Sequence, residues 1–270
     1  MIPSSTISDV RVQITGTHPV GADVSVLSME CPEIAALARP GNFVNIKVSD
    51  SSQPLLRRPF CIHNVRGDTI EVMIKSVGRG TALLCEATCG SSVMVLGPLG
   101  NAFRTDTGEF DNALLVSGGI GTAPMLFLEK TLAAKGIPFR HLVGGRTKND
   151  LLTRGLSNCS TATDDGSEGF RGNVVELLRH HLESPGASGT PKVFACGPNP
   201  MLRALARFCA KRAIPCELSL ESIMGCGVGI CYGCMVELNN ADGEKETILL
   251  CREGPVIDGR RFTGKAPFEE

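Results

Sequence analysis

Residues 113–124 have the sequence Ala-Leu-Leu-Val-Ser-Gly-Gly-Ile-Gly-Thr-Ala-Pro, and this segment decides the class of the fold. It begins with an apolar run, which is typical of a strand buried on both faces of a parallel sheet. The glycines that follow permit a tight turn whose backbone N–H groups can approach a pyrophosphate, and Pro124 suits the first turn of a helix at 125–135. Because the turn departs from a strict G-x-G-x-x-G, it alone equally fits an ordinary strand–helix connection.

The alternation of strands and helices continues through the predicted domain 106–215 and just beyond it. We expect strands at 139–144, 192–196 and 216–220 and helices at 174–183 and 200–211. Short connections between alternating strands and helices indicate a Rossmann-like α/β domain with a parallel sheet and right-handed crossovers. The polar segments 157–172 and 184–190 are expected to be surface loops.

A second motif, Cys196-Gly197-Pro198-Asn199-Pro200-Met201, follows one of the predicted strands. Ligands of open α/β sheets bind outside the carboxyl ends of strands, so Cys196 is a candidate for a nucleotide site, with a packing role as the alternative. The basic segment 145–148 can face an adenosine ribose and favour a 2′-phosphate, or it can be a solvated loop. The sequence therefore leaves the choice between NAD and NADP open.

The segment before this domain is rich in β-strand patterns. Polar and apolar side chains alternate, or apolar ones predominate, in four short segments separated by turn signals. These segments are residues 10–14, 24–27, 43–48 and 70–74. Several short strands of this kind predict an antiparallel β-barrel, which we place at 1–105. Two motifs stand out, L-R-R-P-F-C-I at 56–62 and G-R-G-T at 78–81. Taken singly, they also fit a strand edge with solvated arginines and an ordinary turn.

Four cysteines near the C-terminus have the spacing C-x4-C-x2-C followed by a distant fourth. They are Cys226, Cys231, Cys234 and Cys251. This spacing resembles that of the plant-type ferredoxins and predicts a [2Fe–2S] cluster in a small domain at 216–270. Structural zinc or free buried thiols are the alternatives, but zinc ribbons prefer two short C-x2-C knuckles. The apolar neighbours Ile223, Met224, Val228, Ile230 and Tyr232 are candidates for a partner contact or for burial within the chain.

The composition narrows the functional class. The net charge of −1 gives no sign of nucleic-acid binding or of a basic membrane anchor. No apolar run is long enough to span a membrane, and the first residues lack the pattern of a signal peptide. Twelve cysteines without a secretory signal argue against a disulfide scaffold, so we expect a reducing cytoplasm.

Read in order, the motifs resemble the ferredoxin–NADP reductase superfamily: R-R-P-F-C at 57–61, G-R-G-T at 78–81, G-P-L-G-N-A-F at 97–103, then the two glycine motifs. The resemblance implies that FAD and a nicotinamide nucleotide are bound by Arg58, Pro59, Phe60, Cys61, Met73, Ile74, Lys75, Gly80, Thr81, Gly119, Gly121, Thr122, Cys196, Gly197 and Pro198. Arg58 is then expected to neutralise phosphate charge. Cys61 departs from the serine usual in the family, and a thiol is a weaker hydrogen-bond donor.

With the cysteine loop added, the motif order from 10 to 256 is similar to that of the electron-transfer subunits of the dihydroorotate dehydrogenase B family. This resemblance implies a relay that takes electrons from the FMN of a catalytic partner subunit, through [2Fe–2S] and FAD, to NAD+ in UMP biosynthesis. The implied assembly is a heterotetramer with two copies of each subunit, and the acid–base chemistry on dihydroorotate belongs to the partner. Subunits of ferredoxin transhydrogenases, hydrogenases and sulfite reductases have the same three parts and are the alternative.

Overall fold

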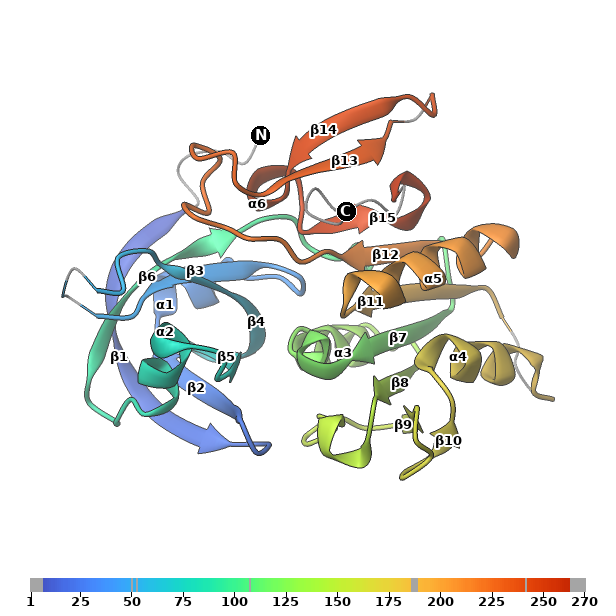
Figure 1. Cartoon of the computed structure of the whole chain (residues 1–270), viewed down its shortest axis with the longest axis horizontal. Coiled ribbons are helices and arrows are strands. Elements are labelled where there is room, and N and C mark those ends of the chain that lie inside the picture. The colour runs from blue at the N-terminus through green and yellow to red at the C-terminus, as the bar shows by residue number, and fades with distance from the viewer. Residues whose placement is uncertain are drawn as a thin grey trace.

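The computed structural model describes residues 7–49, 51, 53–106, 108–185, 189–240 and 242–262. These residues form a barrel, an α/β sheet beside it, and a small C-terminal part that contacts both (Figure 1). In the figure the barrel runs from blue to teal, most of the sheet and its helices run from green to orange, and the C-terminal hairpin and the last strand of the sheet are red-orange to red.

The first part is a closed antiparallel barrel, as predicted from the alternating pattern. Its strands are β1 (Ser8–Pro19), β2 (Val24–Glu30), β3 (Phe43–Lys47), β4 (Arg58–Arg66), β5 (Thr69–Lys75) and β6 (Ser92–Leu99), in the order β1-β2-β5-β4-β3-β6. Two short helices, α1 (Pro32–Ala35) and α2 (Arg79–Cys85), complete it. Alternate side chains such as Val44, Ile46 and Ile62 fill the interior. The intervening residues of β3 and β4 therefore face outward, toward the other two parts.

The second part is a seven-stranded sheet with helices on both faces. Its strands are β7 (Asn112–Gly118), β8 (Phe139–Gly145), β9 (Cys159–Thr163), β10 (Phe170–Arg171), β11 (Pro191–Cys196), β12 (Cys216–Ser219) and β15 (Val256–Asp258), in the order β10-β9-β8-β7-β11-β12-β15. Its helices are α3 (Met125–Ala134), α4 (Val174–Glu183) and α5 (Asn199–Lys211). The strands are parallel except β15, which is antiparallel to β12. Leu115 packs on the side of α3, whereas Leu114 packs on the side of α4 and α5. The predicted parallel α/β arrangement is confirmed.

One expectation for this part is wrong. The polar sequence of residues 157–172 predicts a surface loop, but these residues contain β9 and β10. Strand β9 pairs in parallel with β8 from Cys159 to Thr163. Its sequence, Cys-Ser-Thr-Ala-Thr, lacks the apolar run of the central strands because it lies near the edge of the sheet. In the other expected loop, 184–190, residues 186–188 lie outside the described residues.

The third part is an excursion from the sheet rather than a separate body. It holds the hairpin β13 (Met235–Asn239) and β14 (Lys245–Leu249) and the short helix α6 (Leu250–Glu253). The strands on either side of it, β12 and β15, are neighbours in the sheet. Val236 and Leu250 share one buried core with Leu114 of the central strand. In the described part of the chain, no helix combines the length and apolar character needed to cross a membrane.

The contact between barrel and sheet includes a buried histidine, His63 of β4. Its Nδ1–H donates to the Ala123 carbonyl, just before α3, at 2.6 Å. Burial lowers the pKa of His63, and this effect outweighs the hydrogen bond to the carbonyl, which raises it. Burial therefore favours the neutral imidazole in the folded chain, although either form can donate from Nδ1 to this carbonyl.

We expect acidification to destabilise the folded chain, because the buried His63 ring resists the proton. Because the folded pKa lies below the unfolded value of about 6.5, the unfolded chain binds the proton more readily, and stability is lost as pH falls below about 6.5. Between pH of about 7.5 and 5.5, wild type should lose roughly 1 kcal/mol more unfolding free energy than His63→Asn. Denaturant unfolding at both pH values measures this difference, with His18→Asn, at an exposed position, as the control. Equal losses in wild type and His63→Asn would contradict it.

Candidate functional site

The cysteine loop is curled around the sulfur of Cys226. Three backbone N–H groups donate to this Sγ, those of Val228, Ile230 and Cys231, at 3.4, 3.3 and 3.5 Å. Gly227 and Gly229 have φ of +76° and +84°, in the left-handed region where a side chain is strained. The glycines thus allow the tight curl that directs the N–H groups inward.

The four cysteines form two pairs. The side chains of Cys226 and Cys231 are in hydrogen-bonding contact, and so are those of Cys234 and Cys251. Among the described residues, no three His, Cys, Asp or Glu side chains converge closely enough to hold a single metal ion. Two thiol pairs fit two iron atoms with two protein ligands each better than they fit one tetrahedral zinc ion.

The protein environment distinguishes the thiols electrostatically. Burial raises the pKa of Cys226, but hydrogen bonds from the backbone outweigh this and lower it to about 6. Burial and the contact with Cys234 raise the pKa of Cys251 to about 12. Near neutral pH the loop therefore presents a thiolate at Cys226, the form that binds metal.

The loop is held on the barrel by Asn45 of β3. The Asn45 side chain is fully buried, and its Nδ2 donates to the Cys226 carbonyl at 2.9 Å. A side chain at Gly227 would lie 2.6 Å from this same nitrogen, so the approach requires glycine. Asn45 is paired with Pro59 across β3 and β4. The cysteine loop therefore lies against β3, the neighbour of the strand that carries the R-R-P motif.

The predicted phosphate-binding residues meet at the start of α2. A Cβ at Gly80 would lie 3.0 Å from Arg58 Nε, so the absence of a side chain lets the guanidinium lie against the helix. The Thr81 hydroxyl accepts hydrogen bonds from the N–H groups of Val77 and Gly78 and donates to the Gly78 carbonyl. The G-R-G-T turn is thus fixed by its threonine, with a cation next to it.

The side chains of the other residues predicted to bind the flavin point in different directions in the structure. Cys61 and Met73 belong to an apolar cluster between the barrel and the sheet. Ile74 instead is fully buried in the barrel interior, so only its backbone can face a ligand, whereas Phe60 packs against the same interior and is partly exposed. Lys75 lines a pocket on the sheet.

The two glycine motifs of the sheet are in direct contact. A Cβ at Gly121 would lie 2.4 Å from the Cys196 carbonyl oxygen and 2.5 Å from Gly197 Cα. Thr122 is buried, and its hydroxyl lies 3.0 Å from that of Ser117 at the end of β7. These contacts bring the turns after β7 and β11 together at the carboxyl edge of the sheet, where such folds bind nucleotides.

A pocket of about 350 Å³ opens at this edge. It is lined by Lys75, Gly118, Gly119, Ile120, Gly144, Gly145, Arg146, Asp150, Asp164, Asn173, Val174, Pro198, Met201 and Glu221. Of the predicted residues, Lys75, Gly119 and Pro198 line it directly. Sequence reasoning missed Asp164 and Glu221. Their only signal was position, since each directly follows or nearly follows a strand of the sheet.

The barrel and the sheet also meet through two thiols. The side chains of Cys61, on β4, and Cys196, at the end of β11, are in hydrogen-bonding contact. This contact and burial raise the pKa of Cys196. The residue predicted for the flavin and the residue predicted for the nicotinamide are therefore neighbours.

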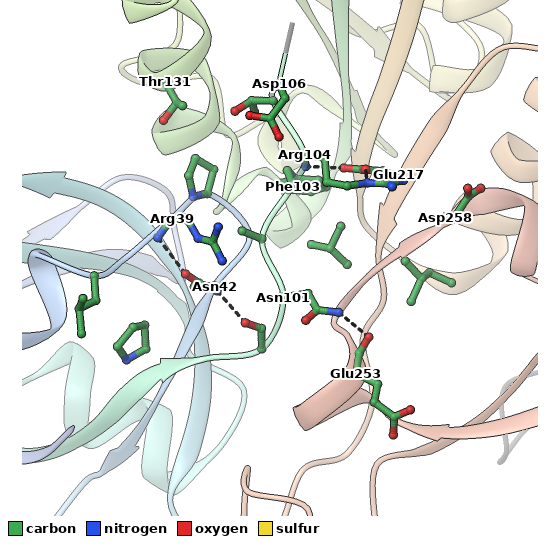
Figure 2. A pocket seen from close by; sticks show the side chains of 18 of the residues that line it. Arg39, Asn42, Asn101, Phe103, Arg104, Asp106, Thr131, Glu217, Glu253 and Asp258 are labelled. Atoms are coloured by element: carbon green, nitrogen blue, oxygen red, sulfur yellow. Dashed lines mark hydrogen bonds and ion pairs between the residues drawn. The ribbon is translucent and has the colours of Figure 1, made fainter. Parts of the chain in front are cut away.

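A cavity of about 1100 Å³ lies elsewhere, between the three parts (Figure 2). On its wall Arg104 Nε donates to Glu217 at 2.6 Å, and Lys192 Nζ donates to the same carboxylate at 3.2 Å. Asn101 Nδ2 donates to the Glu253 carbonyl at 2.6 Å. None of the residues assigned to a cofactor from the sequence lines this cavity. Its polar walls join the barrel, the sheet and the C-terminal part.

The surface around the cysteine loop is apolar. Ile223, Ile230 and Tyr232 are 72%, 77% and 63% exposed. Met224 and Val228 instead pack against the shared core. The five apolar neighbours of the cysteines thus divide into an exposed group and a group that supports the loop.

We expect Asn45→Ala to loosen the cysteine loop, because the Cys226 carbonyl loses its buried donor. The cost should be about 1–3 kcal/mol. Visible circular dichroism and the rate of iron loss to a chelator measure the change, and iron should be lost at least several-fold faster. Asn42→Ala is the matched control, since Asn42 is also buried but donates to the Gly100 carbonyl (Figure 2). Equal rates in the two variants would show that Asn45 has no particular role.

Comparison with known proteins agrees with this geometry. Residues 221–263 match the family described as the iron–sulfur cluster binding domain of dihydroorotate dehydrogenase B. The dihydroorotate dehydrogenase B (NAD(+)) electron transfer subunit of Desulforamulus reducens is 34% identical over 252 residues, covering 91% of this chain and 94% of that protein. The subunit of the same name from Geobacillus kaustophilus is 37% identical over 255 residues, covering 92% and 95%.

Solved structures show the same architecture. The NADH-dependent reduced ferredoxin–NADP oxidoreductase structure, described for flavin-based electron bifurcation, aligns with a TM-score of 0.79 at 25% identity, covering 93% of this chain and 88% of that one. Phthalate dioxygenase reductase aligns with a TM-score of 0.60 at 18% identity, covering 90% and 94%, and shows the fold alone. By its similarity to the curated relatives over nine-tenths of its length, the chain belongs to the family of dihydroorotate dehydrogenase B electron transfer subunits.

Proposed function

We propose that this chain is the electron-transfer subunit of an NAD-dependent dihydroorotate dehydrogenase. In this role it connects the FMN of a catalytic partner subunit with NAD+ in the de novo synthesis of UMP. Family membership supports the proposal, and so does the printed name of the relatives, which specifies NAD(+) and an electron transfer subunit.

One observation carries the proposal: the three predicted cofactor sites are joined by direct contacts. The Cys226 carbonyl is bound by Asn45, Asn45 is paired with Pro59 on the adjacent strand, and two residues further along that strand Cys61 touches Cys196. The order along this path is cysteine loop, flavin strand, nucleotide turn. A relay needs its sites in such an order, whereas a binding module does not.

We assign each cofactor to residues of this path. The four cysteines hold the [2Fe–2S] cluster, the outward residues of β4 with the G-R-G-T turn hold FAD, and the two glycine motifs hold NAD. When bound, the cluster carries single electrons, the nicotinamide takes two, and the flavin can exchange either number. The corresponding parts are 1–105, 106–215 and 216–270, the last attached to the sheet through β12 and β15.

The chain's own residues supply binding and orientation rather than acid–base chemistry. Arg58 places a cation beside the G-R-G-T turn, where it offsets pyrophosphate charge. The apolar residues Met73 and Ile120, together with Cys61, exclude water between the barrel and the sheet. Asp150 lies 3.5 Å from Arg146 and so offsets the charge that would favour a 2′-phosphate, which supports NAD over NADP.

The partner is expected to dock on the exposed apolar group around the cysteine loop. Cys231 is exposed, so a cluster bound there lies close to the surface. We infer a heterotetramer with two copies of each subunit. We also propose a cytoplasmic location, which the family assignment supports.

Reconstitution tests the proposal directly. The purified subunit should reduce a dye with NADH on its own. Dihydroorotate-linked NAD+ reduction should appear only after the cognate FMN subunit is added. Failure to gain this activity, with dye reduction intact, would assign the chain to another complex such as a ferredoxin transhydrogenase, a hydrogenase or a sulfite reductase. A colourless protein containing zinc would refute the redox role.

We expect Cys234→Ser to remove the visible and electron paramagnetic resonance signals of the cluster but to keep most NADH–dye activity. The dye is reduced at the flavin, which Cys234 does not contact in the proposed path. Cys209→Ser is the control, because Cys209 is equally buried in the same core but has no ligand role. If Cys234→Ser loses dye activity as fully as the cluster signals, the cluster also supports the fold.

We expect Gly121→Ala to weaken NADH binding selectively. The added Cβ would lie 2.4 Å from the Cys196 carbonyl, so the turns after β7 and β11 must separate. The KM for NADH should rise at least about tenfold, equivalent to about 1.4 kcal/mol, while bound flavin is retained. Gly16→Ala, which would meet only the flexible His18 side chain, is the control. An unchanged KM would remove Gly121 from the nucleotide site.

A further inference from the structure

Two cysteines from different parts of the chain meet outside the cysteine loop. Cys61 projects from β4 of the barrel and is partly buried, and Cys196 ends β11 of the sheet and is 2% exposed. Their side chains are in hydrogen-bonding contact. The chain therefore holds a thiol pair at the junction between the predicted flavin and nicotinamide sites.

One turn keeps both thiols in place. Cys61 packs with Ile120 and Ala123, which stand on either side of the turn after β7. The backbone of Cys196 presses on Gly121 of the same turn, where no Cβ can fit. Because both cysteines are fixed by one rigid element, their contact does not depend on a flexible loop.

A second thiol pair in the sheet provides a contrast. Cys209 and Cys216 are also in hydrogen-bonding contact, but they are 0% and 6% exposed and lie in the shared core. Cys61, by comparison, lies at a junction that must admit a nucleotide. Of the two pairs, only the Cys61–Cys196 pair lies where a small solute has access.

We propose that Cys61 and Cys196 form a redox-sensitive pair, which a hydroperoxide converts to a disulfide that closes the nucleotide site. The peroxide oxidises the Cys61 thiol to a sulfenic acid, and one water leaves. The Cys196 sulfur then attacks the Cys61 sulfur, the S–O bond breaks, and a second water leaves with the remaining thiol proton. Two electrons pass from the two sulfurs to one peroxide. The sulfurs move from hydrogen-bonding contact to a bond of about 2.0 Å.

The functional consequence rests on the proposed function. A disulfide would tie β4 to the end of β11, next to Pro198 and Ile120, which line the pocket on the sheet. The nicotinamide could then no longer enter between the barrel and the sheet. Reduction by a dithiol would reopen the site.

Peptide mapping of the holoprotein after hydrogen peroxide treatment tests the pair itself. Cleavage by trypsin leaves each cysteine alone in its peptide, Cys61 in 58–66 and Cys196 in 193–203. We expect these two peptides linked, at their summed mass less two hydrogen atoms, in wild type and in Cys89→Ser. The linked species should be absent from Cys61→Ser and Cys196→Ser. Absence of the link in wild type, at a dose that oxidises the exposed Cys89, overturns the proposal.

Activity after the same treatment tests the consequence. Each preparation is compared with its own untreated NADH–dye rate, so that an effect of the substitution on the flavin is separated from oxidation. Wild type should lose at least about 80% of its rate and regain it with dithiothreitol, in step with the linked peptide, a loss equivalent to about 1 kcal/mol. Cys61→Ser should lose much less, although peroxide damages its cluster equally. A linked peptide without loss of rate overturns the closure. An untreated protein without dye activity counts against the proposed function instead.

Discussion

The site depends on one close approach, that of Gly121 to the backbone of Cys196 and Gly197. Any side chain at position 121 would occupy space already filled by the Cys196 carbonyl. This constraint fixes the turn after the central strand β7 against the end of β11, its neighbour in the sheet. Since the same turn also packs on the barrel through Ile120 and Ala123, the nucleotide edge of the sheet and the outer face of the barrel are positioned by a single element.

Buried polar groups complete the arrangement of the three parts. Asn45 ties the cysteine loop to β3, and the Glu217 carboxylate, 3% exposed, accepts hydrogen bonds from Arg104 and Lys192. A buried carboxylate is costly unless it is paired, so these contacts specify which surfaces meet more than they add stability. These contacts therefore fix the positions of the barrel, the sheet and the cysteine loop relative to one another. Electron transfer over short distances between their ligands requires such fixed positions.

Local patterns predicted most of the fold, because apolar runs and glycine turns record burial directly. The strands at 113–117 and 192–196 and the helix at 174–183 follow from such patterns, as does the barrel. The polar residues of β9 suit a strand that is second from the edge of the sheet, and composition cannot distinguish such a strand from a loop. The cysteine spacing anticipated a grouped set of thiols, but not its division into two pairs. Asn45 carries no sequence signal, since its partner lies 181 positions away. The Cys61–Cys196 contact is similarly a product of tertiary packing. Motifs thus identified individual sites, whereas the contacts between sites required the folded chain.

The connection of the cysteine segment to the sheet has a consequence for cluster assembly. All four cysteines lie between β12 and β15, and these neighbouring strands are paired from Glu217–Asp258 to Ser219–Val256. The ends of the segment are thus brought together by sheet hydrogen bonds, which offset a loop-closure entropy of about 3 kcal/mol for a loop of this length. Iron does not have to gather distant ligands from an open chain. The pairing of β12 with β15, which needs no metal, brings the two ends of this segment together. Because β15 follows the last cysteine in the chain, the pairing of β12 with β15 forms only after all four cysteines have been synthesised.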